Sequence, residues 1–330
     1  MNLAVNKIIL LGGCGFLGLE TAKILKKNNY DVIIYDLPTK KNICPNNCEF
    51  REIDLINNNL ENTLNIEKND IVINLASRQY IESNIVPYFG RQEWFNKLNY
   101  HVSNITLQIA IDKNALGYIF FSTDMVYGIP KSLPVSEKND KNPIAEYGIS
   151  KLKAENFLLK KSLNNIPLTI FRPRLISGPG RQGVFKTLFK LINKSLPVPI
   201  IGKGENCYQM VSVLDCAYAI LLAIENKIPN QVFNLASEKK IKVKDLMKNL
   251  INYADSNSVI IPINSGLIKS ILRSFDLLGK TILYKEQYSI ADKDIILNID
   301  KAKNLLKWIP KYDDQAMINA TYDYWLKNVK

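Results

Sequence analysis

The chain has 330 residues, of which 47% are hydrophobic and 22% charged, and its formal net charge is +12. This composition is ordinary for a globular protein with one large or two modest domains. No stretch reaches the eighteen uninterrupted apolar residues of a membrane span, and the first residues lack the pattern of a signal peptide. We therefore expect a cytoplasmic protein with no membrane partner. The lysines are dispersed along the chain, which argues against a nucleic-acid partner.

Five scattered cysteines predict reduced thiols. Cys44 and Cys48 flank a short turn that could begin a metal-binding clip. No second cysteine pair and no nearby histidine complete such a site. We expect no bound metal.

The first predicted unit is a strand at residues 7–11, a glycine turn at 12–18 and a helix at 19–27. The first glycine of the turn permits a sharp exit from the strand, and a middle one lets the backbone approach a pyrophosphate. The last glycine lets helix and strand pack closely, with the helix N-terminus facing the anion. This unit predicts a dinucleotide site. Its predicted residues are Gly12, Gly15, Phe16, Leu17 and Gly18.

An acidic residue ends the second predicted strand, which covers residues 31–35 and leads into Asp36. A carboxylate at this position can accept hydrogen bonds from the adenosine ribose hydroxyls, and it repels a 2′-phosphate. No arginine follows, since the next residue is Leu37. The sequence therefore favours NAD over NADP as the cofactor.

Residues 49–53 and 70–74 predict the third and fourth strands. An acid after the third strand is expected near the adenine, and small residues after the fourth strand leave room for the cofactor. The candidates at these two strand ends are Asp54, Leu55, Leu75, Ala76 and Ser77.

A fifth strand at 118–121 leads into Thr123 and Asp124, and a later helical pattern begins with Tyr147 and Lys151. Ligands of parallel α/β sheets bind at the carboxyl ends of the strands. Four residues make about one helical turn, so the phenol and the ammonium lie on one helix face. A lysine beside a phenol lowers the pKa of the phenol, and such a tyrosine can exchange a proton with an alcohol near neutral pH.

Strand and helix patterns alternate through residue 177, which predicts an α/β fold with a Rossmann-type doubly wound parallel sheet. We expect residues 1–177 to form an NAD-binding domain and residues 178–330 mainly a smaller α/β substrate-binding region. Residues 211–237 are expected to pack back onto the first domain. The later predicted elements are helices at 185–193, 213–225 and 243–253 and strands at 168–171, 198–201 and 231–235.

Taken together, these motifs resemble the extended short-chain dehydrogenase/reductase family, in its nucleotide-sugar epimerase and dehydratase branch. The resemblance covers nearly the whole chain. Its carriers in chain order are GGCGFLG at 12–18, Asp36, STDMVYG at 122–128, YGISK at 147–151, GPG at 178–180 and AKNLLKWIPKY at 302–312. The last of these is similar to the closing helix and Trp-x-Pro turn of the family.

The resemblance implies a role for each matching residue. Tyr147 corresponds to the catalytic acid/base, and Lys151 to the residue that holds the cofactor ribose and lowers the pKa of the tyrosine. Thr123 stands where the family keeps a hydroxyl that bonds the reacting oxygen. Asn99, inside a helix expected at 92–113, matches an asparagine that supports the active site beside the cofactor.

Departures from the family pattern bear on the reaction and on the substrate. The 4,6-dehydratases resemble STDEVYG, whereas Met125 stands here in place of the glutamate. Asp124 remains as a candidate acid, with a structural role in the loop as the alternative. Residues 175–179 differ from the common Asn-Val-Tyr-Gly-Pro, and an arginine that often contacts the nucleotide phosphates has no clear match. The substrate-binding candidates are Arg78, Arg91, Met125, Arg174, Arg181 and Tyr208.

The leading functional hypothesis is an NAD-dependent epimerase that acts on a nucleoside-diphosphate sugar by transient oxidation to a keto-sugar. The alternatives are a 4,6-dehydratase, a 4-keto-sugar reductase, and a non-catalytic NAD-binding regulatory or assembly protein. The resemblance also implies a homodimer through the helices that hold Asn99 and Tyr147. Apolar positions available for that contact, or for an ordinary core, are Ile105, Ile109, Leu152 and Phe157.

Overall fold

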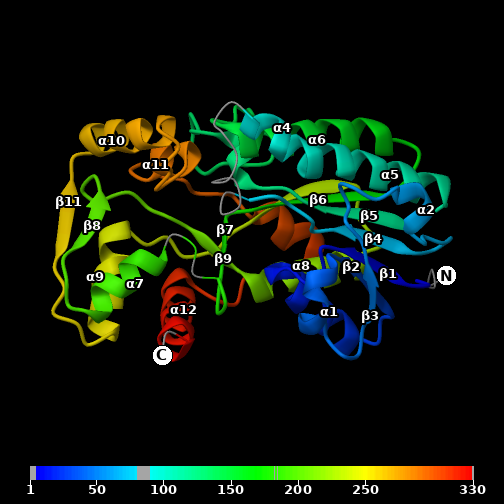
Figure 1. The fold of residues 1–330 in the computed structure, drawn as a ribbon, viewed down its shortest axis with the longest axis horizontal. Helices are drawn as coiled ribbons and strands as arrows, with labels where there is room; N and C mark the ends of the chain where they lie inside the picture. The colour runs from blue at the N-terminus through cyan, green and yellow to red at the C-terminus, as the bar shows by residue number, and fades with distance from the viewer. Residues whose placement is uncertain (1–4, 80–89, 182, 184, 329–330) are drawn as a thin grey trace.

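Figure 1 shows the computed structural model of the chain, which describes residues 5–79, 90–181, 183 and 185–328. Its central feature is a seven-stranded sheet with the order β10-β6-β5-β4-β1-β2-β3, in which every neighbouring pair is parallel. The predicted doubly wound α/β fold is therefore confirmed. The strands are β1 (Ile8–Leu11), β2 (Val32–Asp36), β3 (Glu49–Glu52), β4 (Ile71–Asn74), β5 (Gly117–Phe121), β6 (Leu168–Pro173) and β10 (Gln231–Leu235).

Helices cover both faces of this sheet (Figure 1). Successive side chains of a strand point to opposite faces, so Ile8 and Leu10 join one apolar core and Ile9 and Leu11 the other. Strands buried on both sides read as continuous apolar runs, which explains why the sequence revealed them. The helices of the first core are α1 (Phe16–Lys27) and α8 (Val213–Glu225), and those of the second are α2 (Leu60–Thr63), α5 (Ser103–Asp112) and α6 (Glu146–Ser162).

The helix expected at 92–113 is interrupted. It consists of α4 (Arg91–Asn96), a π-helical turn η3 (Lys97–Val102) and α5. A π turn adds one residue to the helical turn and often occurs at functional sites. Asn99 lies in this turn, and its side chain is completely buried.

The second region lies at one end of the sheet and has its own small core (Figure 1). Two parallel strand pairs belong to it, β7 (Leu175–Ser177) with β9 (Met210–Ser212) and β8 (Val198–Ile201) with β11 (Ile260–Ile263). Phe189, Tyr322 and Trp325 form an aromatic cluster between the helices. The helices are α7 (Phe185–Asn193), α9 (Val243–Tyr253), α10 (Ser265–Leu277), α11 (Lys285–Ile290) and α12 (Asp314–Asn328).

Two elements from this later part of the chain complete the first core. The strand β10 pairs with β6 in parallel, with Gln231 opposite Thr169 and Leu235 opposite Pro173. The helix α8 packs against α1. The sheet that carries the cofactor motif is thus built from segments on both sides of residue 177.

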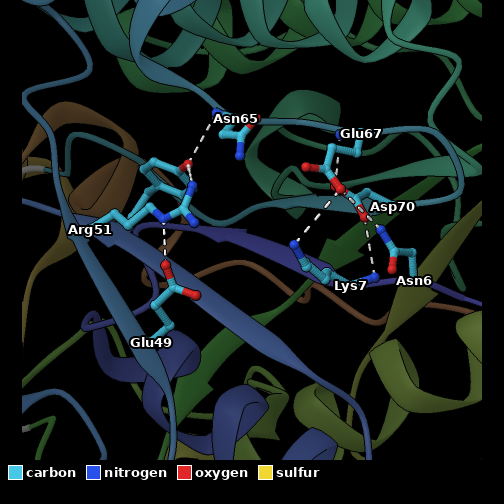
Figure 2. A network of polar contacts seen from close by, with 8 residues as sticks. Asn6, Lys7, Glu49, Arg51, Asn65, Glu67 and Asp70 are labelled. Carbon is cyan, nitrogen blue, oxygen red and sulfur yellow. Dashed lines mark hydrogen bonds and ion pairs between the residues drawn. The ribbon is translucent and has the colours of Figure 1, made fainter.

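Figure 2 shows polar contacts at the start of β1 and β4 and on β3. The carboxylate of Asp70, which is fully buried, accepts hydrogen bonds from the backbone N–H groups of Lys7 at 3.2 Å and Glu67 at 2.8 Å. These bonds join the beginning of β1 to the turn before β4. On β3, Arg51 donates to Glu49 at 2.6 Å.

Hydrogen bonds of the buried Trp308 and of Asp215 hold the segment before the last helix in place. Trp308 donates its indole N–H to the carbonyl of Asp215 at 2.8 Å, and the Asp215 carboxylate accepts from the N–H groups of Lys311 at 3.1 Å and Tyr312 at 3.2 Å. The helical part of the segment 302–312 is only a short π turn, η5 (Ala302–Leu306). The closing helix of the chain is α12, which begins after this segment.

Asp314, at the start of α12, gives a pH-dependent prediction. It is 2% exposed and accepts from the N–H of Met210 at 3.0 Å, and burial raises its pKa from 3.8 to about 7. A carboxyl with a raised pKa contributes stability that is present below pH 4 and lost as the pH rises through 7. We expect Asp314→Asn to lose less stability than the wild type between pH 4 and 8. Thermal melting across this range measures the two slopes, and equal slopes would contradict the prediction.

Within the described ranges, no helix has both the length and the apolar character that a membrane crossing needs. All five cysteines are free thiols. No cluster of three or more histidine, cysteine or acidic side chains suited to a metal ion occurs among the residues that the structure describes.

Candidate active site

A cleft of about 530 Å³ lies where the parallel strands of the large sheet end. Its walls include the residues that follow β1, β2, β4, β5 and β6, and residues of the second region such as Arg181 and Gln287. The predicted site residues that line it are Gly12, Gly15, Phe16, Leu17, Gly18, Asp36, Asp54, Leu55, Leu75, Ala76, Ser77, Arg78, Thr123, Asp124, Met125, Tyr147, Lys151, Arg174 and Arg181.

The glycine turn has the geometry of an anion site. Gly12 has a positive φ of 74°, and a Cβ there would lie 2.8 Å from the Cα of Ala76. Gly15 is exposed and precedes α1, whose first turn contains no acidic residue and has no side-chain cap. The first N–H groups of α1 are consequently available to a negatively charged ligand.

Asp36 holds the turn and faces the same cleft. One carboxylate oxygen accepts from the N–H of Cys14 at 2.8 Å, and the other accepts from the N–H of Leu37 at 2.8 Å. Each oxygen has a further lone pair for a ribose hydroxyl. The residues present therefore fit NAD, because the helix N-terminus suits its pyrophosphate and Asp36 its adenosine ribose.

We expect Gly18→Ala to weaken NAD binding. A Cβ at Gly18 would lie 2.5 Å from the carbonyl oxygen of Gly13 and 2.6 Å from that of Gly12, so α1 would have to move away from the turn. Overpacking typically costs about 1–3 kcal/mol, which corresponds to a roughly five- to hundredfold higher dissociation constant. Isothermal titration calorimetry measures this constant. Gly266→Ala is the control, because the nearest atom to its Cβ is 3.4 Å away and it lies outside the cleft; an unchanged affinity in Gly18→Ala would contradict the prediction.

The three residues predicted for proton transfer come from two elements. Thr123 caps the short helix η4 (Asp124–Tyr127) and accepts from the N–H of Met125 at 3.2 Å. Tyr147 and Lys151 lie on the first turns of α6, and the Tyr147 ring is 5.8 Å from that of Phe95 on α4. The Lys151 ammonium donates to the carbonyl of Phe121 at 2.6 Å. All three side chains line one cleft.

The direction of the pKa shift of Tyr147 differs from the expectation. Burial raises its pKa, and the opposing influences come from the charge of Arg181 and from hydrogen bonds with Ser77 and Thr123. The Lys151 ammonium bonds a backbone carbonyl, and burial lowers its own pKa to about 7. In the protein alone, the charge of Arg181 is the largest of the influences that lower the pKa of the phenol.

Asp124 forms a buried ion pair with Arg174. Its carboxylate accepts from the guanidinium at 2.8 Å, and the two side chains are 5% and 0% exposed. Burial raises the pKa of Asp124, while the Arg174 charge acts in the opposite direction. The other face of this guanidinium lies over the ring of Tyr208 at 4.3 Å. Asp124 is therefore fixed by a partner from the strand end of β6.

Two further arginines line the cleft. Arg181 donates to the amide oxygen of Gln79, and its guanidinium lies 5.7 Å from the ring centroid of Phe16. Arg78 stacks on Trp94 at 4.5 Å and donates to its carbonyl at 2.7 Å. Positive charge thus borders the cleft on both the cofactor side and the second region, which suits a ligand with several negative charges.

Comparison with known proteins identifies the family to which the chain belongs. Residues 8–236, more than half of the chain, match the profile of the NAD dependent epimerase/dehydratase family. The chain belongs to this family. It is therefore an NAD-dependent enzyme of the epimerase/dehydratase type.

Proteins that are similar to this chain are named for different activities. A putative UDP-glucose 4-epimerase from Methanocaldococcus jannaschii is 28% identical over 97% of this chain and 98% of its own length. A dTDP-D-glucose 4,6-dehydratase from Dictyostelium discoideum is 28% identical over 76% of this chain and 63% of its own length. The crystal structure of UDP-glucose 4-epimerase from Thermotoga maritima with UDP-glucose superposes with a TM-score of 0.79 and 24% identity, covering 98% of this chain and 100% of that one.

Three predicted residues do not line the cleft of this epimerase/dehydratase family member. The guanidinium of Arg91 donates instead to Asp276 at 2.7 Å and to Thr281 at 2.9 Å, which ties α4 to α10. Tyr208 lies behind Arg174 as its stacking partner. The side-chain amide of Asn99 is bonded to other parts of the protein. It accepts a hydrogen bond from the N–H of Arg78 at 2.9 Å and donates one to the hydroxyl of Ser150 at 3.1 Å.

Some residues of the enzyme's cleft were not predicted, above all Gln79, Pro173 and Gln287. Pro173 ends β6, so the rule that ligands bind at strand ends was a sufficient signal for it. Gln79 follows Arg78 closely but belongs to no motif. Gln287 reaches the cleft from α11, and no sequence pattern indicates that approach.

Proposed function

We propose that the protein epimerises the sugar of a nucleoside diphosphate sugar by transient oxidation to a keto-sugar. The observation that carries this proposal is that Thr123, Tyr147 and Lys151 line the same cleft as the glycine turn. The names of relatives that match most of the chain, such as the putative UDP-glucose 4-epimerase, support the substrate class.

Each residue has a defined task in this reaction. Tyr147 takes the proton of a sugar hydroxyl as a phenolate and later returns it as a phenol. Thr123 hydrogen-bonds the reacting oxygen, and Lys151 would hold the cofactor ribose. When bound, NAD supplies reversible hydride acceptance. The sugar loses one proton and one hydride and regains both, with the hydride returned to the opposite face, so the reaction has no net oxidation.

The diphosphate of the substrate is assigned to Arg181. Of the arginine candidates, Arg91 does not line the cleft, and the charge of Arg174 is paired with the carboxylate of Asp124. Arg181 instead bonds the neutral amide of Gln79, so its charge is not paired with an acid there. The guanidinium of Arg181 lines the cleft, and burial lowers its pKa, a penalty that a bound dianion would relieve. Positive charge at the mouth also favours association with an anionic substrate.

The Asp124–Arg174 pair favours epimerisation over dehydration. Dehydration removes a carbon-bound proton beside the keto group and expels a hydroxyl, so it needs an acid and a base in addition to the tyrosine. Met125 has no titratable proton, and the carboxylate of Asp124 is bound by Arg174 at 2.8 Å. Neither residue is then available for those two proton transfers.

Mass spectrometry of the product separates the alternatives. The purified enzyme is incubated with NAD and a panel of UDP- and dTDP-hexoses, and separately with NADH and a nucleotide-linked 4-keto-sugar. The expected product of the first incubation has the mass of the substrate and a different sugar configuration. Loss of water would establish a dehydratase. Gain of two hydrogens with NADH consumed would establish a reductase. Steady NADH release would establish a dehydrogenase and exclude the epimerase.

We also propose a homodimer through α4, α5 and α6. Of the four apolar positions considered, Ile109 is only 4% exposed and belongs to the core, so it is unavailable, whereas Ile105 is 41% exposed. Leu152 and Phe157 are half-buried. Light scattering at micromolar concentration should give the mass of two chains, and a monomer would contradict the proposal. The cytoplasmic location remains a prediction.

A further inference from the structure

The helix with Tyr147 has no capping side chain at its own start. Ala145 precedes α6, and no side chain of the adjoining residues accepts a hydrogen bond from the first turn. The first N–H groups of a helix need an acceptor when they are buried. Here the acceptor comes from far along the chain: Oε1 of Glu286 on α11 accepts from the N–H of Gly148 at 2.8 Å and from that of Ala145 at 3.3 Å.

This contact has little room for adjustment. Glu286 is completely buried, and a Cβ on Gly148 would lie 2.8 Å from Oε1 of Glu286 and 2.9 Å from the carbonyl oxygen of Met125. The backbone directly after Tyr147 therefore lies between α11 on one side and the loop after β5 on the other. Small shifts of α11 are transmitted to the position of the phenol because the packing leaves no space.

The segment that leads into α11 contacts α4, because the guanidinium of Arg91 lies 5.9 Å from the ring centroid of Tyr284, the residue before α11. Arg91 on α4 binds Asp276 at the end of α10 in an ion pair whose side chains are both 5% exposed. Phe95, one turn further along α4, places its ring 5.8 Å from that of Tyr147. Gln287, the neighbour of Glu286, lines the cleft. The same short helix thus touches both the ligand cavity and the base of the catalytic helix.

We propose that Glu286 is a positioning residue for Tyr147: it holds the first turn of α6 so that the phenol stays beside Thr123 in the cleft. The inference rests on the proposed role of Tyr147 as the acid/base. It makes the second region part of the catalytic apparatus, since closure of that region on a substrate and placement of the phenol would be mechanically coupled. Geometry of the reacting groups controls such steps steeply, and a displacement of about 1 Å can reduce the rate roughly a hundredfold.

Three variants of Glu286 test the proposal. Glu286→Ala removes the acceptor, Glu286→Asp withdraws it by one methylene, and Glu286→Gln keeps an oxygen acceptor at the same reach. Burial raises the pKa of Glu286 to about 8, so glutamine also matches the neutral acid that prevails at pH 7. We expect the alanine and aspartate variants to lose about 10- to 100-fold in kcat with KM within about twofold, and the glutamine variant to recover most of kcat.

Hydrogen exchange provides a measurement that needs no substrate. In Glu286→Ala and Glu286→Asp, the amides of residues 145–151 should exchange at least about tenfold faster than in the wild type, and in Glu286→Gln near the wild-type rate. If the wild type converts no nucleotide sugar, the proposed function fails, while this measurement still tests whether Glu286 holds the helix. If exchange changes but kcat does not, the positioning role is wrong.

The matched control is Asp215→Ala. Asp215 is also a buried carboxylate that accepts two backbone N–H groups, from Lys311 and Tyr312, but it lies outside the cleft. We expect this variant to be less stable and to keep wild-type kcat and exchange at 145–151. If the alanine variant of Glu286 does not fold, the other two decide: glutamine must exceed aspartate in kcat, and the reverse order or equality overturns the proposal.

Discussion

Replacing Tyr147 with phenylalanine is expected to lower kcat by roughly two to four orders of magnitude, the usual contribution of a positioned acid/base group. The variant keeps the ring and loses only the hydroxyl, so the contact with Phe95 and the backbone bonds of α6 persist. Binding of NAD should be retained. Steady-state epimerisation and calorimetric titration with NAD measure the two quantities separately.

Tyr253→Phe is the control for this experiment. Its hydroxyl bonds Asp323 at 2.7 Å on the surface, and it does not line the cleft. The control should keep wild-type kcat. If Tyr147→Phe keeps more than about a tenth of wild-type kcat, another group transfers the proton and the assignment of the acid/base is wrong.

The second large effect concerns stability. Glu155 on α6 forms bonds with Arg172 on β6 at 2.6, 3.0 and 3.2 Å, and the two side chains are 0% and 2% exposed. Removing one member of a buried pair leaves an uncompensated charge in the interior. We expect Glu155→Gln to reduce the free energy of unfolding by about 3–5 kcal/mol. Denaturation in urea measures it.

A surface pair provides the contrast. Glu49 and Arg51 are 2.6 Å apart, but their side chains are 52% and 31% exposed. An exposed ion pair contributes at most about 1 kcal/mol, so Glu49→Gln should change little. Similar losses in both variants would show that the interior of the sheet tolerates the unpaired Arg172. A double variant, Glu155→Leu with Arg172→Leu, should regain part of the lost stability because neither charge then remains buried.

The strands of the large sheet were predictable because burial on both faces makes them continuous apolar runs. The sequence 8–11, for example, is Ile-Ile-Leu-Leu, and all four side chains are inaccessible. The glycine turn and Asp36 were equally accessible to prediction, since both depend on local order along the chain. Thr123 was predicted from its place after a strand, and Tyr147 from its spacing to Lys151 on one helix face, and the family resemblance gave both their roles.

What sequence reasoning missed depends on contacts between distant segments. Arg91 was predicted to bind substrate, but its partner Asp276 is 185 positions away, and no local pattern reveals such a pair. The pKa of Tyr147 was misjudged for the same reason, because burial and Arg181 act on it while the adjacent Lys151 bonds elsewhere. Gln287 lines the cleft because α11 packs beside it, and only the folded structure shows where α11 lies.

The pairing of β10 with β6 affects the order in which the chain can fold. On the ribosome, residues 8–173 emerge first and can form every strand of the sheet except the last. Until Gln231–Leu235 appears, β6 is an unprotected edge with free backbone donors and acceptors, and the face of α1 that later meets α8 stays exposed. During this part of synthesis, aggregation of the nascent chain competes with completion of the sheet. The competition ends only when more than two thirds of the protein has been made.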